Sequence, residues 1–265
     1  MKRRAFLRVL TAGSAGVVVG GASWGVHERL QLSVTRATLP VHGLPAGFAG
    51  FKIAFLTDLH RSGLVPADLI ARAAEAAMRE RPDLIVLGGD YVTNFDTRFA
   101  GPVAEVLGTL SAPAGVIAVL GNHDDDRVVP AALTRRGIRV LREERLRLTV
   151  GGAAVDFIGI GYWTQRAAKI APLIEPAALP ILVAHDPRRL TEAHTLKIPL
   201  LLSGHTHGGQ VVLPPFGAFN RLRFPIVAGT LVRDDTRLFV SRGIGTVYLP
   251  IRINCPPELA VLTLA

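Results

Sequence analysis

The sequence predicts an α/β fold built on a largely parallel β-sheet with helices covering its faces. Short apolar strands alternate with helical segments along residues 51–120, an order that is typical of parallel sheets. A polar cluster follows each of these strands, and the carboxyl ends of such strands form the ligand crevice of open α/β sheets. The chain of 265 residues is 49% hydrophobic and 19% charged, so it can bury a large core.

Apolar runs predict the strands, and alanine-rich or periodic stretches between them predict the helices. Pro66 stands near the start of the first helix, where proline is tolerated. The expected strands are 51–57, 83–87, 115–120, 146–150, 153–159, 181–184, 200–203, 211–213, 237–240 and 259–264. The expected helices are 66–81, 99–110 and 130–136.

The pattern changes after residue 145. Gly151-Gly152 separates two apolar runs and predicts a β-hairpin. The pairing therefore becomes antiparallel here, and a second sheet is expected. The sequence shows no internal repeat, no low-complexity tract and no clear boundary between two domains.

Residues 1–24 resemble a targeting segment. Arg3-Arg4 precedes Phe6-Leu7, and a weakly apolar run rich in Gly, Ala and Val extends from Val9 to Trp24. This order resembles a twin-arginine signal, the export route of proteins that are already folded. We therefore expect the twin-arginine machinery to be a partner and the protein to reach the periplasm or the outer face of the cytoplasmic membrane.

The same segment leaves a second interpretation open. No clear Ala-x-Ala cleavage site precedes Trp24, and the run is short and glycine-rich for a membrane span. An uncleaved N-terminal anchor is therefore the alternative to a cleaved signal. Residues 25–50, interrupted by Pro40, Gly43 and Pro45, are expected to be a connector.

The net charge of +9 suits anionic partners such as phosphate esters and acidic lipid headgroups. Nucleic acid is also anionic, but no run of basic and aromatic residues supports it as a partner, and none is expected. The single cysteine, Cys255, excludes an internal disulfide and a cysteine zinc cluster.

Polar clusters follow five of the apolar strands. A single Asp or His in such a place is usually a helix cap, a turn residue or a hydrogen-bonded side chain. Five of the eight histidines lie in these clusters, however, and this joint pattern predicts a metal site. The clusters are Asp58/His60, Asp90, Asn122/His123/Asp124, His185 and His205/His207.

Carboxylate and imidazole ligands together suit divalent manganese, iron or zinc. A central Asp can bridge two ions through its two oxygens. Two ions about 3.5–4 Å apart activate a water molecule and clamp both oxygens of a displacement at phosphorus. The amide of Asn122 adds a ligand oxygen without adding negative charge.

The order Asp-x-His, Gly-Asp, Gly-Asn-His-Asp, His and Gly-His-x-His over residues 51–210 resembles the calcineurin-like metallophosphoesterases. Gly208-Gly209-Gln210 and Ser241-Arg242-Gly243-Ile244-Gly245 are similar to a bacterial subgroup. That subgroup contains exported phosphodiesterase-like proteins and relatives that act on lipid-linked nucleotide diphosphates. The resemblance implies a metallophosphoesterase domain over residues 51–265. It also implies two packed mixed β-sheets flanked by helices, a four-layer αββα sandwich.

The resemblance also implies a role for each residue in a centre of two divalent ions. Asp90 would bridge the ions. His123 would protonate the leaving oxygen or contact phosphate, oriented by Asp124. One ion would be held by Asp58, His60 and His207, and the other by Asn122, His185 and His205.

These roles predict a phosphoester hydrolase in which metal-bound hydroxide attacks phosphorus in line. We expect a phosphodiesterase or pyrophosphatase acting on an envelope or lipid-linked phosphate ester. A metal-dependent envelope binding protein without catalysis is the alternative.

Residues 213–224 contain glycines and prolines and are expected to form an irregular rim. Their apolar side chains would admit a lipid tail or contact a membrane surface, with Arg221 and Arg223 near the headgroups. Ordinary loop packing is the alternative. The apolar side chains in question are Phe216, Phe219, Leu222 and Phe224.

Overall fold

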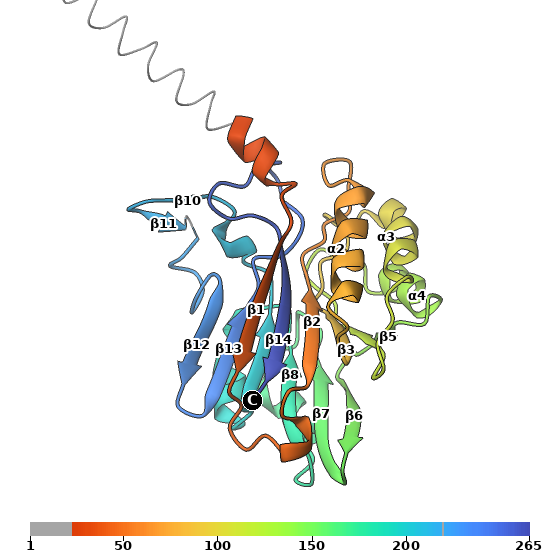
Figure 1. The fold of residues 1–265 in the computed structure, drawn as a ribbon, viewed down its shortest axis with the longest axis vertical. Helices are drawn as coiled ribbons and strands as arrows, with labels where there is room; N and C mark the ends of the chain where they lie inside the picture. The colour runs from red at the N-terminus through yellow and green to blue at the C-terminus, as the bar shows by residue number, and fades with distance from the viewer. Residues whose placement is uncertain (1–22, 219) are drawn as a thin grey trace, which may run out of the picture.

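The computed structural model describes residues 23–218 and 220–265. The twin-arginine pair and Phe219 lie outside the described residues. Two six-stranded mixed sheets pack face to face, and helices cover their outer faces (Figure 1). The four-layer sandwich expected from the sequence is therefore confirmed.

The first sheet has the order β1-β14-β2-β3-β4-β5. Strands β2 to β5 are parallel to one another, whereas β14 runs antiparallel to β2 and parallel to β1. Helices α2 (Ala67–Arg79), α3 (Ala100–Leu107) and α4 (Val128–Thr134) lie beside it in Figure 1. The strands are β1 (Ser33–Leu39), β2 (Lys52–Leu56), β3 (Leu84–Leu87), β4 (Val116–Ala118), β5 (Arg139–Val140) and β14 (Glu258–Leu264).

The second sheet has the order β12-β13-β9-β8-β7-β6. Its four central strands are parallel, and each edge strand is antiparallel to its neighbour. The strands are β6 (Glu144–Val150), β7 (Ala153–Gly159), β8 (Leu179–Val183), β9 (Leu200–Ser203), β12 (Gly229–Arg233) and β13 (Thr236–Val240). The short helices α5 (Ala167–Ile170) and α6 (Leu190–Thr195) pack against this sheet.

A small separate ribbon is formed by β10 (Val212–Leu213) and β11 (Gly217–Ala218). Single turns of 3₁₀ helix occur at Ala46–Phe48, Thr97–Phe99, Ala171–Leu173, Pro187–Arg189 and His207–Gly209. Among the described residues, no helix combines the length and the apolar character needed to cross a membrane.

The layers follow from strands that are buried on both faces. In β2, Ala54 and Leu56 pack with the helices, whereas Ile53 and Phe55 pack against the second sheet. A strand covered on both sides needs apolar residues at successive positions, which explains the continuous apolar runs in the sequence. A third cluster, which contains Leu201 and Leu238, fills the space between the second sheet and α5 and α6.

The structure differs from the expected connector over residues 25–50. Residues 23–28 are helical, and β1 forms a seven-residue edge strand that pairs with β14. Most residues of β1 are exposed or half-buried, so its sequence shows no long apolar run. The short elements β5, β12, α5 and α6 escaped prediction for a similar reason, because they are brief and none is apolar throughout.

Candidate metal centre

Five strand ends from the two sheets meet at one place. Strands β2, β3 and β4 carry the first three polar clusters, and β8 and β9 of the opposite sheet carry the remaining two. Three groups of potential ligands lie there, with all ligand atoms of a group within 4.8 Å of one another. The groups are Asp58/His60/His207, His60/Asp90/His123 and Asp90/His185/His205.

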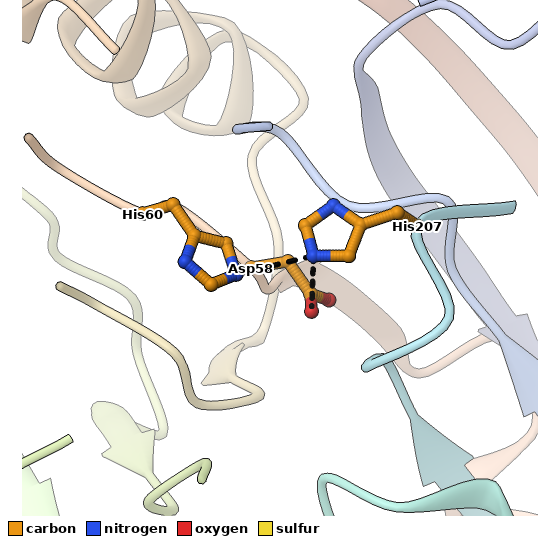
Figure 2. A group of neighbouring side chains, drawn as sticks. All are labelled: Asp58, His60 and His207. Atoms are coloured by element: carbon orange, nitrogen blue, oxygen red, sulfur yellow. Dashed lines mark hydrogen bonds and ion pairs between the residues drawn. The ribbon is translucent and has the colours of Figure 1, made fainter. Parts of the chain in front are cut away.

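The first group joins β2 to the loop after β9. Figure 2 shows His60 and His207 with their rings turned toward each other above Asp58. The two Nε2 atoms are 3.1 Å apart, and Nε2 of His207 is 3.4 Å from Oδ1 of Asp58. Two nitrogens that bind one ion at about 2.1 Å each lie about 3 Å apart at a right angle. The spacing therefore fits one shared cation.

Two further predicted ligands, His185 and Asn122, have buried ligand atoms that lack hydrogen bonds in the described part of the chain. Nδ1 of His185 lies 2.7 Å from the carbonyl oxygen of Gly88 and donates its proton there, so Nε2 is the nitrogen that would bind a metal ion. Oδ1 of Asn122 has no hydrogen-bond partner among the described residues, and Nε2 of His185 has the carboxylate oxygens of Asp90 and Asp58 as neighbours but no hydrogen bond of good geometry. Buried polar atoms without partners are rare in folded proteins, and a metal ion would satisfy both.

Asp90 belongs to both the second and the third of these groups. Its Oδ2 atom is 3.3 Å from Nε2 of His60 and 3.1 Å from Nε2 of His185. Its other oxygen accepts a hydrogen bond from the backbone N–H of His123 at 2.8 Å. One carboxylate oxygen thus faces a ligand from each group, which is the position that a bridge between two ions requires.

The electrostatics of the centre favour bound cations. Burial, together with the charge of His185, lowers the pKa of His205 to about 3. Burial and the nearby His60 hold the pKa of His207 well below its usual range. Both rings are therefore neutral at pH 7, which is the form that binds metal ions.

His185 shows the opposite effect. Burial acts to lower its pKa, but the charges of Asp90 and Asp58 outweigh burial and raise the pKa to about 10. The two carboxylates thus favour a positive charge at this point, which a divalent ion would supply.

Five predicted ligands adopt left-handed backbone conformations. Such values are uncommon for residues other than glycine and persist where the surroundings enforce them. The backbone N–H of His205 donates to both carboxylate oxygens of Asp58 at 3.0 Å, which holds two of these turns together. The φ angles are 54° at Asp58, 48° at His60, 57° at Asp90, 71° at His205 and 53° at His207.

The glycines of the motifs provide space for the ligands. A Cβ atom on Gly121 would lie 2.1 Å from Oδ1 of Asp90, and one on Gly204 would lie 2.3 Å from Oδ2 of Asp58. Neither position accommodates a larger residue unless a ligand moves.

Asp124 contacts the loop that carries Asp90. Its carboxylate accepts hydrogen bonds from the backbone N–H groups of Asp90, Tyr91 and Gly121 at 2.8–2.9 Å, and so fixes the loop that carries Asp90. His123 is oriented by the backbone N–H of Asn94, which donates to Nδ1 at 3.0 Å. Which of these groups contacts His123 depends on the loop conformation, and the spacing of residues in the sequence does not determine that conformation.

Sequence reasoning missed a group of residues beside His205. The ring centres of Tyr162 and Phe224 lie 5.4 Å and 5.3 Å from the ring centre of His205. Arg188 lies over Phe224 and contacts both the Tyr162 hydroxyl and the Asp186 carboxylate. The sequence predicts Phe224 as part of an apolar rim, but nothing in the sequence indicates its contact with the predicted metal ligand His205.

A second unpredicted group supports His207 from behind. Arg252 is fully buried, and its guanidinium donates to the carbonyl oxygens of Gly245 and Cys255 at 2.6 and 2.9 Å. The Cys255 thiol donates to the backbone oxygen of His207 at 3.2 Å. Glu28 accepts from the backbone N–H groups of Asn254 and Cys255 at 3.0 and 2.7 Å, so the N-terminal helical residues brace this loop.

Comparison with known proteins agrees with this geometry. The family model for calcineurin-like phosphoesterases matches residues 51–209. The chain is 33% identical to phosphodiesterase YaeI of Escherichia coli over 226 residues, covering 82% of this chain and 83% of YaeI. It is 31% identical to the uncharacterized metallophosphoesterase YkuE of Bacillus subtilis, covering 100% of this chain and 98% of YkuE.

A solved structure shares the fold at low sequence identity. Sulfate thiohydrolase SoxB from Thermus thermophilus is 14% identical, with a TM-score of 0.51 over 77% of this chain and 53% of SoxB. The likeness at this identity concerns the fold alone. The family model and the two bacterial relatives, together with the clustered His and Asp residues, show that the chain belongs to the calcineurin-like phosphoesterase family.

Proposed function

We propose that the protein is a phosphodiesterase with two divalent ions that acts on an envelope or lipid-linked phosphate ester. The position of Asp90, with one oxygen facing both ligand groups, supports a centre for two ions rather than one. The relative YaeI is named a phosphodiesterase, which favours a diester over a pyrophosphate bond as the substrate. Manganese, iron and zinc all suit the ligand set.

The predicted ligands would form two metal sites. Asp58, His60 and His207 would hold one ion, Asn122, His185 and His205 the other, and Asp90 both. When bound, the ions supply an activated water molecule and neutralise charge on the phosphate. Because Nδ1 of His123 accepts the Asn94 N–H, the neutral ring carries its proton on Nε2, where it can form a hydrogen bond to an oxygen of the phosphate.

Hydrolysis of bis-(p-nitrophenyl) phosphate by the purified full chain with added Mn²⁺ tests the proposal. We expect Asp90→Ala and His205→Ala to lower kcat at least about 100-fold, a loss typical of removing a group that stabilises the transition state. Metal content measured on the same samples should fall in both variants. His194→Ala is the matched control, because His194 contacts Asp234 outside the centre. Parent-like rates in the Asp90 and His205 variants would contradict the proposal.

The inactive binding protein is distinguished in the same assay. It would retain two metal ions, and would turn over none of a panel of mono-, di- and pyrophosphate esters. Relative kcat/KM values across that panel, with lipid-linked members included, would also define the bond that is cleaved.

Export by the twin-arginine route is the second part of the proposal. It rests on Arg3-Arg4 and the apolar run behind them. A reporter fused after residue 50 should leave the cytoplasm with the parent sequence and remain inside when Arg3-Arg4 is replaced by Lys-Lys. Equal export of both fusions would exclude this route.

A further inference from the structure

Exposed apolar side chains gather at one end of the molecule, beside the metal centre. Seven of the thirteen large apolar side chains that are exposed in the described residues belong to two loops and to the first helical residues. We call this the basic-apolar surface. It comprises Trp24, Val26, Leu213, Phe216, Arg221, Leu222, Arg223, Tyr248 and Leu249.

Hydrogen bonds join the segments of this surface. Val212 pairs with Ile253 through its backbone N–H at 2.9 Å, and the side chain of Gln210 donates to the carbonyl oxygen of Leu249 at 2.9 Å. The backbone N–H of Arg252 donates to Gly25 at 3.0 Å, which ties the first helical residues to the same loop. In Figure 1 the first helical residues and the β10–β11 ribbon lie at the same end of the molecule.

The most prominent side chains are more exposed than is usual for apolar residues. Leu222 is 91% exposed and Phe216 is 74% exposed, and both line a groove of about 290 Å³ beside β10 and β11. Apolar groups exposed this far gain free energy when an apolar environment covers them.

The described segments that form this surface expose no acidic side chain. The sequence contains no Asp or Glu between residues 193 and 233 or between residues 236 and 257. Arg221 and Arg223 are exposed beside Leu222, whereas Glu28, at the end of the first helical residues, is buried. Apolar side chains with neighbouring arginines and without acidic groups complement an anionic lipid surface.

The course of the chain supports the same partner. The described residues begin at this end with residue 23, and the sequence has no Lys, Arg, Asp or Glu from residue 9 to residue 26. An apolar segment that interacts with a bilayer would therefore be joined directly to the basic-apolar surface.

We infer that the basic-apolar surface docks onto an anionic phospholipid bilayer. Docking there would bring the metal centre to the headgroup layer, because Phe224 lies 5.3 Å from His205 and Tyr248 lies 6.2 Å from His123, measured between ring centres. This inference deepens the proposed function, since it gives the phosphoesterase a source of substrate in the plane of the membrane.

Cosedimentation of the full chain with vesicles tests the inference. The vesicles contain phosphatidylglycerol and phosphatidylcholine at 3:7, and pure phosphatidylcholine vesicles serve for comparison. We expect Phe216→Ser with Leu222→Ser to weaken binding to the mixed vesicles at least tenfold. Arg221→Ser with Arg223→Ser should weaken binding to the mixed vesicles but not to the neutral ones, and the effect should disappear in 1 M NaCl.

The matched control is Val232→Ser with Arg233→Ser, which removes the same kinds of exposed side chain from the β12–β13 hairpin. Parent-like binding by the Phe216/Leu222 variant would overturn the inference. The inference would also be overturned if the parent protein formed a dimer through this surface and did not bind vesicles. Turnover of the soluble diester is measured in parallel: if the parent binds vesicles but hydrolyses nothing, the proposed function fails while the docking surface stands.

Discussion

At the residue scale, the centre depends on glycines as well as on ligands, because a Cβ atom at Gly121 or Gly204 would collide with a ligand. Gly204→Ala would place a methyl group 2.3 Å from Oδ2 of Asp58. We expect this variant to displace Asp58 and to lower metal affinity at least about tenfold, comparable to losing a group that positions a ligand. Gly63→Ala is the control, since no heavy atom lies within 4 Å of its new Cβ. Isothermal titration with Mn²⁺ would measure the difference.

Asp124 gives a second prediction at this scale. The Asp124 carboxylate accepts hydrogen bonds from backbone N–H groups, among them those of Asp90 and Tyr91 at 2.8 Å. Asp124→Asn replaces one of the two accepting oxygens by an N–H₂ group, which cannot accept these hydrogen bonds. Leaving buried donors without acceptors costs about 1–3 kcal/mol each. We expect the free energy of unfolding, measured in urea, to fall by about 2–4 kcal/mol. A variant with unchanged stability and a reduced kcat would show instead that Asp124 acts through His123.

At the element scale, α3 contains a glycine that lowers its stability. Gly101 is exposed in this helix, and an added Cβ would meet no heavy atom within 4 Å. We expect Gly101→Ala to raise the free energy of unfolding by about 0.5–1 kcal/mol, the helix preference of Ala over Gly. Gly137 has the same open space but a φ of +79°, so Gly137→Ala should lower stability. Opposite signs in urea unfolding would confirm that backbone conformation decides both effects.

The helical residues 23–28 are the element that supports His207 from outside the region matched by the family model. Glu28→Ala would remove the acceptor for two backbone N–H groups, including that of Cys255 at 2.7 Å. We expect a loss of about 1–3 kcal/mol in stability and a weaker metal affinity, because the Cys255 thiol contacts the His207 backbone. Glu105→Ala removes an exposed carboxylate from α3 and should change neither quantity.

Elements with a continuous apolar run were predictable, and weakly patterned ones were not. The buried strands β2, β3, β8 and β9 are apolar over most of their length because both faces are covered, so their positions follow from composition. Strand β1 is largely exposed, and only its pairing with β14 makes it a strand. That pairing joins residues more than 200 positions apart, and no local signal encodes it.

The candidate ligands were predictable for a related reason. Asp58 and Asp90 come shortly after strands of one sheet, whose carboxyl ends lie together, and His205 comes shortly after a strand of the opposite sheet. Phe224 and Arg252 come from loops whose course is set by tertiary packing, and their place beside the ligands could not be read from spacing. The hydrogen bonds of Asp124 with the backbone of Asp90 and Tyr91 likewise depend on a loop conformation that spacing does not determine.

At the scale of the whole molecule, the domain extends beyond the region that the family model matches. A chain that begins at residue 51 lacks β1 and Glu28, whereas one that begins at residue 23 retains both. We expect the shorter chain to expose the edge of β14, to aggregate and to bind no Mn²⁺. The longer one should fold and bind it. Size-exclusion chromatography with metal analysis would compare them, and a monomeric, metal-binding chain from residue 51 would contradict this boundary.

The pairing of β1 with β14 also determines when the molecule can be completed. Leu39 lies opposite Leu264 in the register, so β1 must wait until β14 has been synthesised. Until then β1 has no neighbour in its sheet, and contacts this distant in sequence form slowly. The first sheet is therefore completed late in synthesis, and any step that requires the folded domain must follow the emergence of β14.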